Sequence, residues 1–264
     1  MARRGNLPLS TFGLNLPLIR EGDELVPLIL SALREKGLTL FRGDIVVVAS
    51  KALSASMGSS VNLSSVKPSS KAHQLARDYD LEPRFVELVI READEVFGGV
   101  SQALLTLKGG NLIANAGIDQ KNAGRGLVAL WPRGLERLAT KLRRQLEASV
   151  KKRIGVMIID SRTTPSRMGT TGFCLAASGF ETVLDCRGEK DLFGRRLVIT
   201  RMAIADDLAA VAHLLMGEGS QRNPIAIIKN APIKLSLKKI PMTISPSECL
   251  FLRVFDPNPI LPSN

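Results

Sequence analysis

Acidic and hydroxyl side chains follow apolar stretches at several points of the sequence, a pattern typical of cation sites. The apolar residues 154–159 run directly into Asp160 and Ser161, and Asp119 and Glu218 follow two further apolar stretches. Carboxylate and hydroxyl oxygens are the ligands that Mg²⁺ and Mn²⁺ prefer, with phosphate oxygens completing the shell. If the fold brings the three acids together beside Ser161, they would form a site for one or two cations that bridge nucleotide phosphates.

The same residues also have a simpler structural interpretation. An aspartate followed by a serine commonly caps a helix or begins an Asx-turn, and three surface acids can lie far apart. No G-x-x-x-x-G-K-[ST] segment occurs and no G-x-G-x-x-G follows a strand, so a nucleotide would be held by another kind of loop. Spacing alone cannot show that the three acids meet, and taken alone such a strand end is more often a turn.

The elements that must position these groups are predicted from periodicity. Buried strands are predicted at 45–49, where the run ends in Ser50 and Lys51, and at 154–159. Further strands are predicted at 197–200 and 225–228. A hairpin is predicted from 104–107 and 112–114. Helices are predicted from Asp23 as N-cap to residue 35, from Pro83, over 135–146, and over 204–215 with an end near Gly217. The serine-rich stretch 54–70 is typical of a loop. The irregular alternation favours an α+β fold, with mixed sheets and flanking helices, over a doubly wound sheet.

Composition excludes several classes of protein. The 264 residues suffice for one large or two modest domains, and 45% hydrophobic with 23% charged residues is ordinary for a globular protein. No apolar run reaches the roughly 18 residues that a membrane-spanning helix needs, and we expect a cytoplasmic protein. The three cysteines form no C-x-x-C pair, so neither a disulfide framework nor a zinc site is predicted.

The net charge of +11 implies attraction to anions. Nucleic acid is disfavoured as the partner, because the chain has a single Trp and a single Tyr and no basic stretch interleaved with aromatic residues that could stack on bases. A small molecule that carries phosphate would account for part of the charge, and solvation of the surface for the rest.

Several segments together resemble one known family, the GTP-dependent γ-glutamyl ligases of the deazaflavin coenzyme F-420. They occur in the family's order and extend from about residue 16 to residue 228. The segments are LPLI at 16–19, GDIVVVASK at 43–51, EPRFVELVIREADEV at 82–96, ANAGIDQKN at 114–122, GVMIIDS at 155–161, RGEKDLFGR at 187–195 and ADDLAAVAHLLMGE at 205–218.

The resemblance implies an enzyme that forms an amide bond. The γ-phosphate of GTP would activate a carboxylate of the deazaflavin precursor, and L-glutamate would attack the acyl phosphate. It also implies a homodimer of the family's distinctive α+β fold, with Mg²⁺ or Mn²⁺ and a possible K⁺. Residues 1–264 would form a single ligase-like unit, which could divide into two interleaved subdomains, with 229–264 as a C-terminal extension beyond the family-like region.

The resemblance also implies roles for individual residues, although it leaves the catalytic residues unknown. The metal ligands would be Asp119, Asp160, Ser161 and Glu218. The residues that contact GTP would be Leu16, Pro17, Leu18, Ile19, Ser50, Lys51, Asn122, Gly217, Gly219 and Ser220.

The sequence departs from the family's pattern in two places. Where the family continues V-V-S-K-A-E-G, this chain has ALSASMG at 52–58, so Ala55 replaces a lysine expected to face phosphate and Met57 replaces a glutamate. Beyond Ser161, RTTPSR at 162–167 replaces F-G-R-P-W-R. Losing a cation beside a polyphosphate weakens its binding. Two alternatives therefore stay open: a paralogue that binds nucleotide or deazaflavin without ligating, and a ligase for a different phosphorylated acid.

Overall fold

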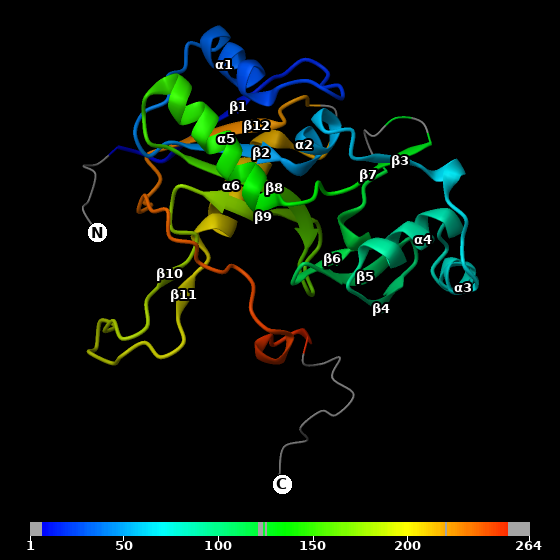
Figure 1. The fold of residues 1–264 in the computed structure, drawn as a ribbon. Helices are drawn as coiled ribbons and strands as arrows, with labels where there is room; N and C mark the ends of the chain where they lie inside the picture. Colours follow the sequence, from blue (N-terminus) through cyan, green and yellow to red (C-terminus); the bar gives the residue numbers. More distant parts are fainter. Residues whose placement is uncertain (1–6, 121–123, 125, 220, 253–264) are drawn as a thin grey trace. The chain divides into compact units, whose positions relative to one another are not determined.

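The computed structural model describes residues 7–120, 124, 126–219 and 221–252 (Figure 1). They fall into two compact units. The first unit comprises Met1–Ser60 and Leu130–Ile240, and the second comprises Val61–Ala129 and Pro241–Asn264. Among the described residues, no helix is both long and apolar enough to cross a membrane.

A five-stranded mixed sheet forms the centre of the first unit. Its order is β1 (Ser10–Leu14), β12 (Ile225–Lys229), β2 (Ile45–Ala49), β8 (Gly155–Thr163) and β9 (Thr170–Ser178). Only the β2–β8 pair is parallel; the other neighbouring pairs are antiparallel. The central strands β2 and β12 are almost entirely apolar and buried, because helices cover both faces of the sheet. The predicted strands at 45–49 and 225–228 are confirmed.

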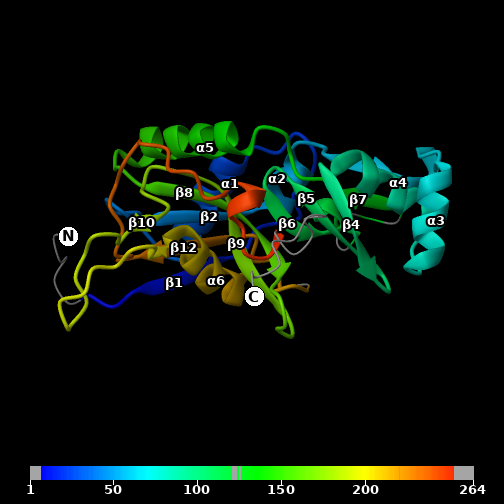
Figure 2. The same ribbon diagram turned by 90° about the horizontal axis from the view of Figure 1, so that it is seen from below.

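Helices lie on the two faces of this sheet. One face packs against α1 (Leu25–Glu35) and α5 (Leu135–Val150), and their apolar sides join the strands in one core cluster. The other face carries α6 (Ile204–Met216), which packs against β9, β1 and β12 (Figure 2). A short helix, α2 (Ser50–Ser56), follows β2 without a connecting loop. The mixed sheet with flanking helices confirms the predicted α+β class.

A long arm extends from the first unit between two short paired strands, β10 (Leu184–Asp185) and β11 (Arg201–Met202) (Figure 1). The strand predicted at 197–200 is wrong. Val198 and Ile199 are 77% and 82% exposed, and the Leu197 N–H donates to the Glu189 carbonyl within the arm. A β-branched run was not sufficient for a strand here, because its side chains are exposed and do not pack against a sheet.

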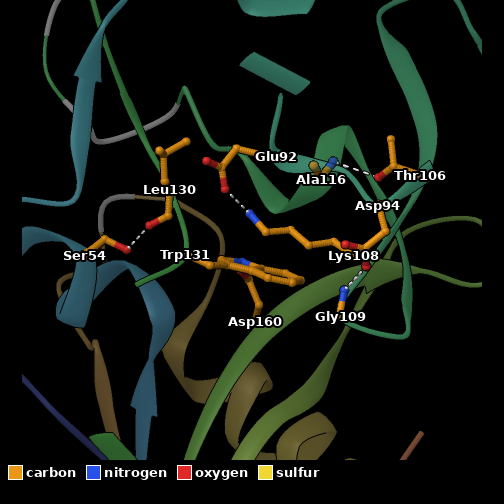
Figure 3. A network of polar contacts seen from close by, with 10 residues as sticks. All are labelled: Ser54, Glu92, Asp94, Thr106, Lys108, Gly109, Ala116, Leu130, Trp131 and Asp160. Carbon is orange, nitrogen blue, oxygen red and sulfur yellow. Dashed lines mark hydrogen bonds and ion pairs between the residues drawn. The ribbon is translucent and has the colours of Figure 1, made fainter. Parts of the chain in front are cut away.

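The second unit is smaller and contains its own sheet, β4 (Glu95–Val100), β5 (Ala103–Lys108) and β6 (Asn111–Ala114), in that order. The predicted hairpin is thus confirmed. The remaining elements are α3 (Ser70–Asp78), α4 (Pro83–Glu92), the pair β3 (Ser60–Asn62) and β7 (Leu127–Ala129), and three short 3-10 turns, η1 (Leu63–Ser65), η2 (Asn115–Gly117) and η3 (Pro246–Glu248). The Lys108 ammonium pairs with Glu92 at 2.7 Å, which ties β5 to α4 (Figure 3).

Two local predictions are wrong at their boundaries. The N-cap of α1 is Glu24, whereas the Asp23 carboxylate accepts a hydrogen bond from the Arg20 N–H in the turn before it. The stretch 54–70 is not a continuous loop, because α2 continues to Ser56 and β3 and η1 follow. Serines are tolerated in α2 since their hydroxyls bond carbonyls of the preceding turn, as Ser54 does with Ser50.

Glu87 is a buried acid that joins α3 to α4, with 8% of its surface exposed. Its carboxylate accepts hydrogen bonds from the Ser69 N–H at 2.9 Å, at the N-cap of α3, and from Arg91 Nε at 2.8 Å. Hydrogen bonds from the Ser69 hydroxyl and N–H lower the pKa of Glu87, with a further contribution from Arg91. The ionised carboxylate therefore stabilises the folded state.

We expect Glu87→Gln to lower the free energy of unfolding by about 1–3 kcal/mol at neutral pH, because buried donors lose a charged acceptor. The depressed pKa means that this stabilisation is present above the ordinary glutamate pKa and is lost as the pH falls through the folded value. Urea unfolding of both proteins across acid pH should show the difference shrinking. Glu95→Gln, at an exposed position of β4, is the control; equal unfolding curves at neutral pH would contradict the assignment.

Candidate active site

The parallel pair β2–β8 brings the first two candidate groups together. Its register places Ala49 beside Ile159, so the next residues, Ser50 just after β2 and Asp160 within β8, are neighbours. The Ser50 hydroxyl donates to Asp160 Oδ2 at 2.9 Å. The strand β8 continues to Thr163, so the interpretation of Asp160 and Ser161 as a turn after the strand is wrong.

Asp160 has a dense set of hydrogen-bond donors. Trp131 Nε1 donates to Oδ2 at 2.5 Å, and the Ser161 N–H donates to Oδ1 at 2.8 Å; Figure 3 shows Trp131 lying against Asp160. Burial raises the pKa of the Asp160 carboxyl, and these hydrogen bonds and the nearby charge of Lys51 oppose that rise. The carboxylate is held in a fixed orientation, and its charge is costly unless a cation balances it.

A second polar cluster adjoins the first through Ser161. The Ser161 side chain lies near enough to Glu218 to lower the pKa of its carboxyl. Glu218 Oε1 accepts a hydrogen bond from the Thr170 hydroxyl at 3.0 Å and lies 2.7 Å from His213 Nε2. Burial alone would raise the pKa of Glu218, but His213, Ser161 and Thr170 together lower it to about 2. Glu218 is therefore an anion at neutral pH, positioned just beyond the C-terminal end of α6.

Arg162 is the residue after Ser161 on β8. Its guanidinium lies 4.8 Å from the centre of the Phe173 ring, and Nη2 is 3.1 Å from Asp206 Oδ2 on α6. The other oxygen of Asp206 accepts a hydrogen bond from the Cys174 N–H, beside the register shift between β8 and β9. Segment 162–167 is where the sequence differs from the family's pattern, and its first residue, Arg162, is held by stacking and by a salt bridge.

Two of the segments expected to contact a nucleotide lie side by side. The segment 16–19 follows β1, and the Leu16 N–H donates to the Arg222 carbonyl at 3.2 Å, so this segment lies beside the chain that follows Glu218. Gly217 ends α6 with a φ of 69°, and the Gly219 N–H donates to the Gln221 side chain at 2.8 Å. Lys51 lies in the first turn of α2.

For three predicted residues, membership of this site stays a prediction. Asp119 belongs to the second unit, where its N–H and carbonyl pair with Ala129 at 3.0 and 2.8 Å; its meeting with Asp160 stays a prediction. Asn122 and Ser220 lie outside the described residues. Within the described ranges, no group of three acidic, histidine or cysteine side chains is clustered tightly enough to hold a metal ion by itself.

Comparison with known proteins assigns the chain to a family. The profile described as "F420-0:Gamma-glutamyl ligase" matches residues 13–230. Proteins named "Coenzyme F420:L-glutamate ligase" are similar over most of their length. The one from Archaeoglobus fulgidus is 38% identical over 81% of this chain and 84% of its own, and the one from Methanothermobacter thermautotrophicus is 36% identical over 82% and 86%. The chain belongs to the F420-0:gamma-glutamyl ligase family.

Both polar clusters lie inside the part of the chain that matches the γ-glutamyl ligase family. A relative from Methanocaldococcus jannaschii, which carries the same name, is 34% identical over 91% of this chain and 95% of its own. The predicted resemblance to the family is confirmed. It places Ser50, Asp160, Ser161 and Glu218 within a shared sequence framework, although it assigns no role to any of them.

Sequence reasoning missed three residues of the site. Trp131 was unremarkable because it follows a short apolar stretch, yet it is the only Trp in the chain. His213 lies within the apolar pattern of α6, which gives no local sign of a polar role, and it bonds Glu218 five residues later. Thr170 begins β9 directly opposite Thr163, a pairing that only the hairpin register reveals. Rarity was a usable signal for Trp131 and His213, since the chain has two histidines.

Proposed function

We propose that the protein is a ligase that adds L-glutamate to the deazaflavin coenzyme F-420 precursor at the expense of GTP. An oxygen of the precursor's carboxylate would attack the γ-phosphorus of GTP, with release of GDP and formation of an acyl phosphate. The amino nitrogen of glutamate would then attack the acyl carbon, phosphate would leave, and the ammonium proton would pass to solvent. The single observation that carries the proposal is the family match over residues 13–230.

Asp160, Ser161 and Glu218 are the residues that we propose hold Mg²⁺ or Mn²⁺. They offer only oxygen atoms, the chemistry that hard cations select, and such ions are usually bound by one or two carboxylates with phosphates in the remaining positions. The bound ion would neutralise charge on the polyphosphate. Ser50 keeps Asp160 oriented through its 2.9 Å hydrogen bond, while His213 and Thr170 fix one oxygen of Glu218.

The remaining features of the proposal follow the resemblance to the family. Residues 16–19, Lys51 and the segment after Gly217 would contact GTP, together with Asn122 and Ser220. Asp119 would contribute a further oxygen ligand, K⁺ would be an additional cation, and the enzyme would be a homodimer. Light scattering on the purified protein tests the dimer directly.

Incubation of the protein with GTP, Mn²⁺, L-glutamate and the unglutamylated coenzyme tests the reaction. We expect GDP and a product heavier by one glutamate residue to appear in equal amounts by mass spectrometry. GDP without an adduct would indicate a different acceptor, and the absence of both products would contradict the proposal. Omission of glutamate is the control, because it should prevent the mass gain.

A paralogue that binds nucleotide without ligating is the second candidate, and Ala55 is the observation that favours it. Ala55 lies in the last turn of α2, five residues after Ser50, and Met57 follows it at 46% exposure. A nucleotide in this site would lack the cation that the family's pattern supplies here. Tight GTP binding by calorimetry with no turnover would favour this candidate over the ligase.

We expect Ala55→Lys to strengthen GTP binding about five- to tenfold, because a charge-assisted contact to phosphate contributes about 1–1.4 kcal/mol. Lysine is nearly as good a helix former as alanine, so α2 should be preserved. Calorimetric titration with GTP at low and high salt measures the change, and the gain should shrink with salt. Ala55→Gln is the matched control, with a similar length and no charge; an equal gain from glutamine would refute the electrostatic explanation.

A further inference from the structure

The hydrogen bonds that Asp160 accepts can be compared with the number of lone-pair positions on its carboxylate. An ionised carboxylate has about four lone-pair positions, two on each oxygen. Oδ2 accepts two hydrogen bonds, from the Ser50 hydroxyl and from Trp131 Nε1. Oδ1 accepts one, from the Ser161 N–H. Both positions on Oδ2 are therefore filled, whereas Oδ1 receives one of these three hydrogen bonds.

Trp131 is the donor that decides this count. Its side chain is buried, with 8% exposed, and its ring packs against Phe173, with 6.3 Å between the ring centres. The indole N–H has no accepting capacity and cannot rotate away without moving the whole ring. The Ser50 hydroxyl, in contrast, can turn about its C–O bond. The indole therefore makes Oδ2 unavailable to a cation for as long as the ring keeps its place.

We infer that Trp131 is a positioning residue that restricts Asp160 to one metal-binding oxygen and thereby selects a small cation over Ca²⁺. Mg²⁺ and Mn²⁺ accept octahedral shells in which a carboxylate contributes one oxygen, whereas Ca²⁺ takes more oxygens at longer distances and commonly binds a carboxylate through both. Removal of the indole N–H would open the second oxygen. This inference rests on the metal dependence in the proposed function, and it concerns only the choice between cations.

Binding of Mn²⁺ and Ca²⁺ to the complete protein tests the inference without an activity assay. Free Mn²⁺ is measured by electron paramagnetic resonance, alone and in competition with Ca²⁺. Because Trp131 is the only Trp, quenching of its emission by Mn²⁺ also reports whether the ion lies beside Asp160. For the unaltered protein we expect quenching and a preference for Mn²⁺, and for Asp160→Asn we expect neither.

In Trp131→Phe, which keeps the ring and loses the donor, we expect Mn²⁺ affinity to fall about tenfold. Ca²⁺ affinity should fall less, so the ratio of the two affinities should fall as well. Ser50→Ala removes the other donor to Oδ2 and should shift the ratio in the same direction if Trp131→Phe does not fold. Phe173→Leu perturbs the packing around Trp131 while keeping both donors, and its ratio should stay unchanged.

An unchanged ratio in both Trp131→Phe and Ser50→Ala would overturn the inference while leaving the proposed ligase intact. An equal shift in Phe173→Leu would also overturn it, since loosened packing would then suffice. Failure of the unaltered protein to bind Mn²⁺ would overturn both the inference and the proposed metal site. The glutamate adduct measured by mass spectrometry separates that result from a failure of the ligase proposal itself.

Discussion

Replacement of Asp160 by asparagine is expected to lower ligase turnover at least about 100-fold. Loss of a residue that merely orients a metal ligand costs about 10- to 100-fold, and Asp160 is proposed as a ligand itself. Asparagine keeps the shape and an oxygen for the donors at Oδ2, and it removes the negative charge. The rate of GDP release with saturating GTP, glutamate and Mn²⁺, compared between the two proteins, measures the effect.

The same substitution should leave stability unchanged or raise it. Burial raises the pKa of the Asp160 carboxyl, which means that the ionised group costs free energy in the folded state. A buried acid that lowers stability in this way is typical of a functional site. Asp207→Asn, at an exposed position of α6, is the matched control and should keep full turnover. If Asp160→Asn is as active as the unaltered protein, the proposed metal role is excluded.

The elements of the first unit were largely predictable, because local patterns govern them. The run at β2 and the run at β12 are apolar, β-branched and short, and both are strands. The periodic leucines of α5 and the apolar stretch of α6 also fold as predicted. These segments bury their apolar side chains in the same way in almost any fold, so periodicity was sufficient.

The site was predictable residue by residue only in part, because register is a long-range property. Ser50 and Asp160 meet because Ala49 pairs with Ile159, 110 positions away in sequence, a partnership that no local pattern encodes. The strand β8 runs four residues past its apolar portion because β9 continues to pair with it there. Polar residues are acceptable in that extension since backbone hydrogen bonds, and not burial, hold it.

In the arm, a local pattern predicted a strand that the structure does not contain. The apolar run at 197–200 satisfied the local criterion for a strand, but Val198 and Ile199 are exposed. The strand pairing of the arm occurs instead at Arg201–Met202 with Leu184–Asp185. Propensity for β structure describes how well a side chain fits a covered sheet, so it has little predictive value where nothing covers the chain.

Gly172 is the residue whose substitution should most strongly disturb the second polar cluster. It lies on β9 opposite Ser161, where α6 packs against the sheet. A Cβ added at Gly172 would lie 2.4 Å from the Ala209 carbonyl oxygen and 2.7 Å from the His213 Cβ. The first contact is with helix backbone, so α6 itself must move. Its movement would displace His213 and, beyond the helix end, Glu218 relative to β8 and β9.

We expect Gly172→Ala to lower the free energy of unfolding by about 1–3 kcal/mol, the usual cost of overpacking a core. Turnover should fall by up to about 100-fold at a temperature where the variant is still folded, because displacement of catalytic groups by about 1 Å has an effect of that size. Differential scanning calorimetry and the GDP-release assay measure the two quantities separately.

Gly13→Ala is the matched control for this prediction. Gly13 also lies in a strand of the same sheet, β1, but its added Cβ would meet only the Asn223 side chain at an ordinary 3.4 Å. It should lose little stability and no turnover. If Gly172→Ala lost stability and kept full turnover, the position of α6 would matter for folding alone, and Glu218 would not need its contact with Ser161. A loss of turnover larger than the loss of folded protein instead ties the close packing of α6 to the proposed chemistry.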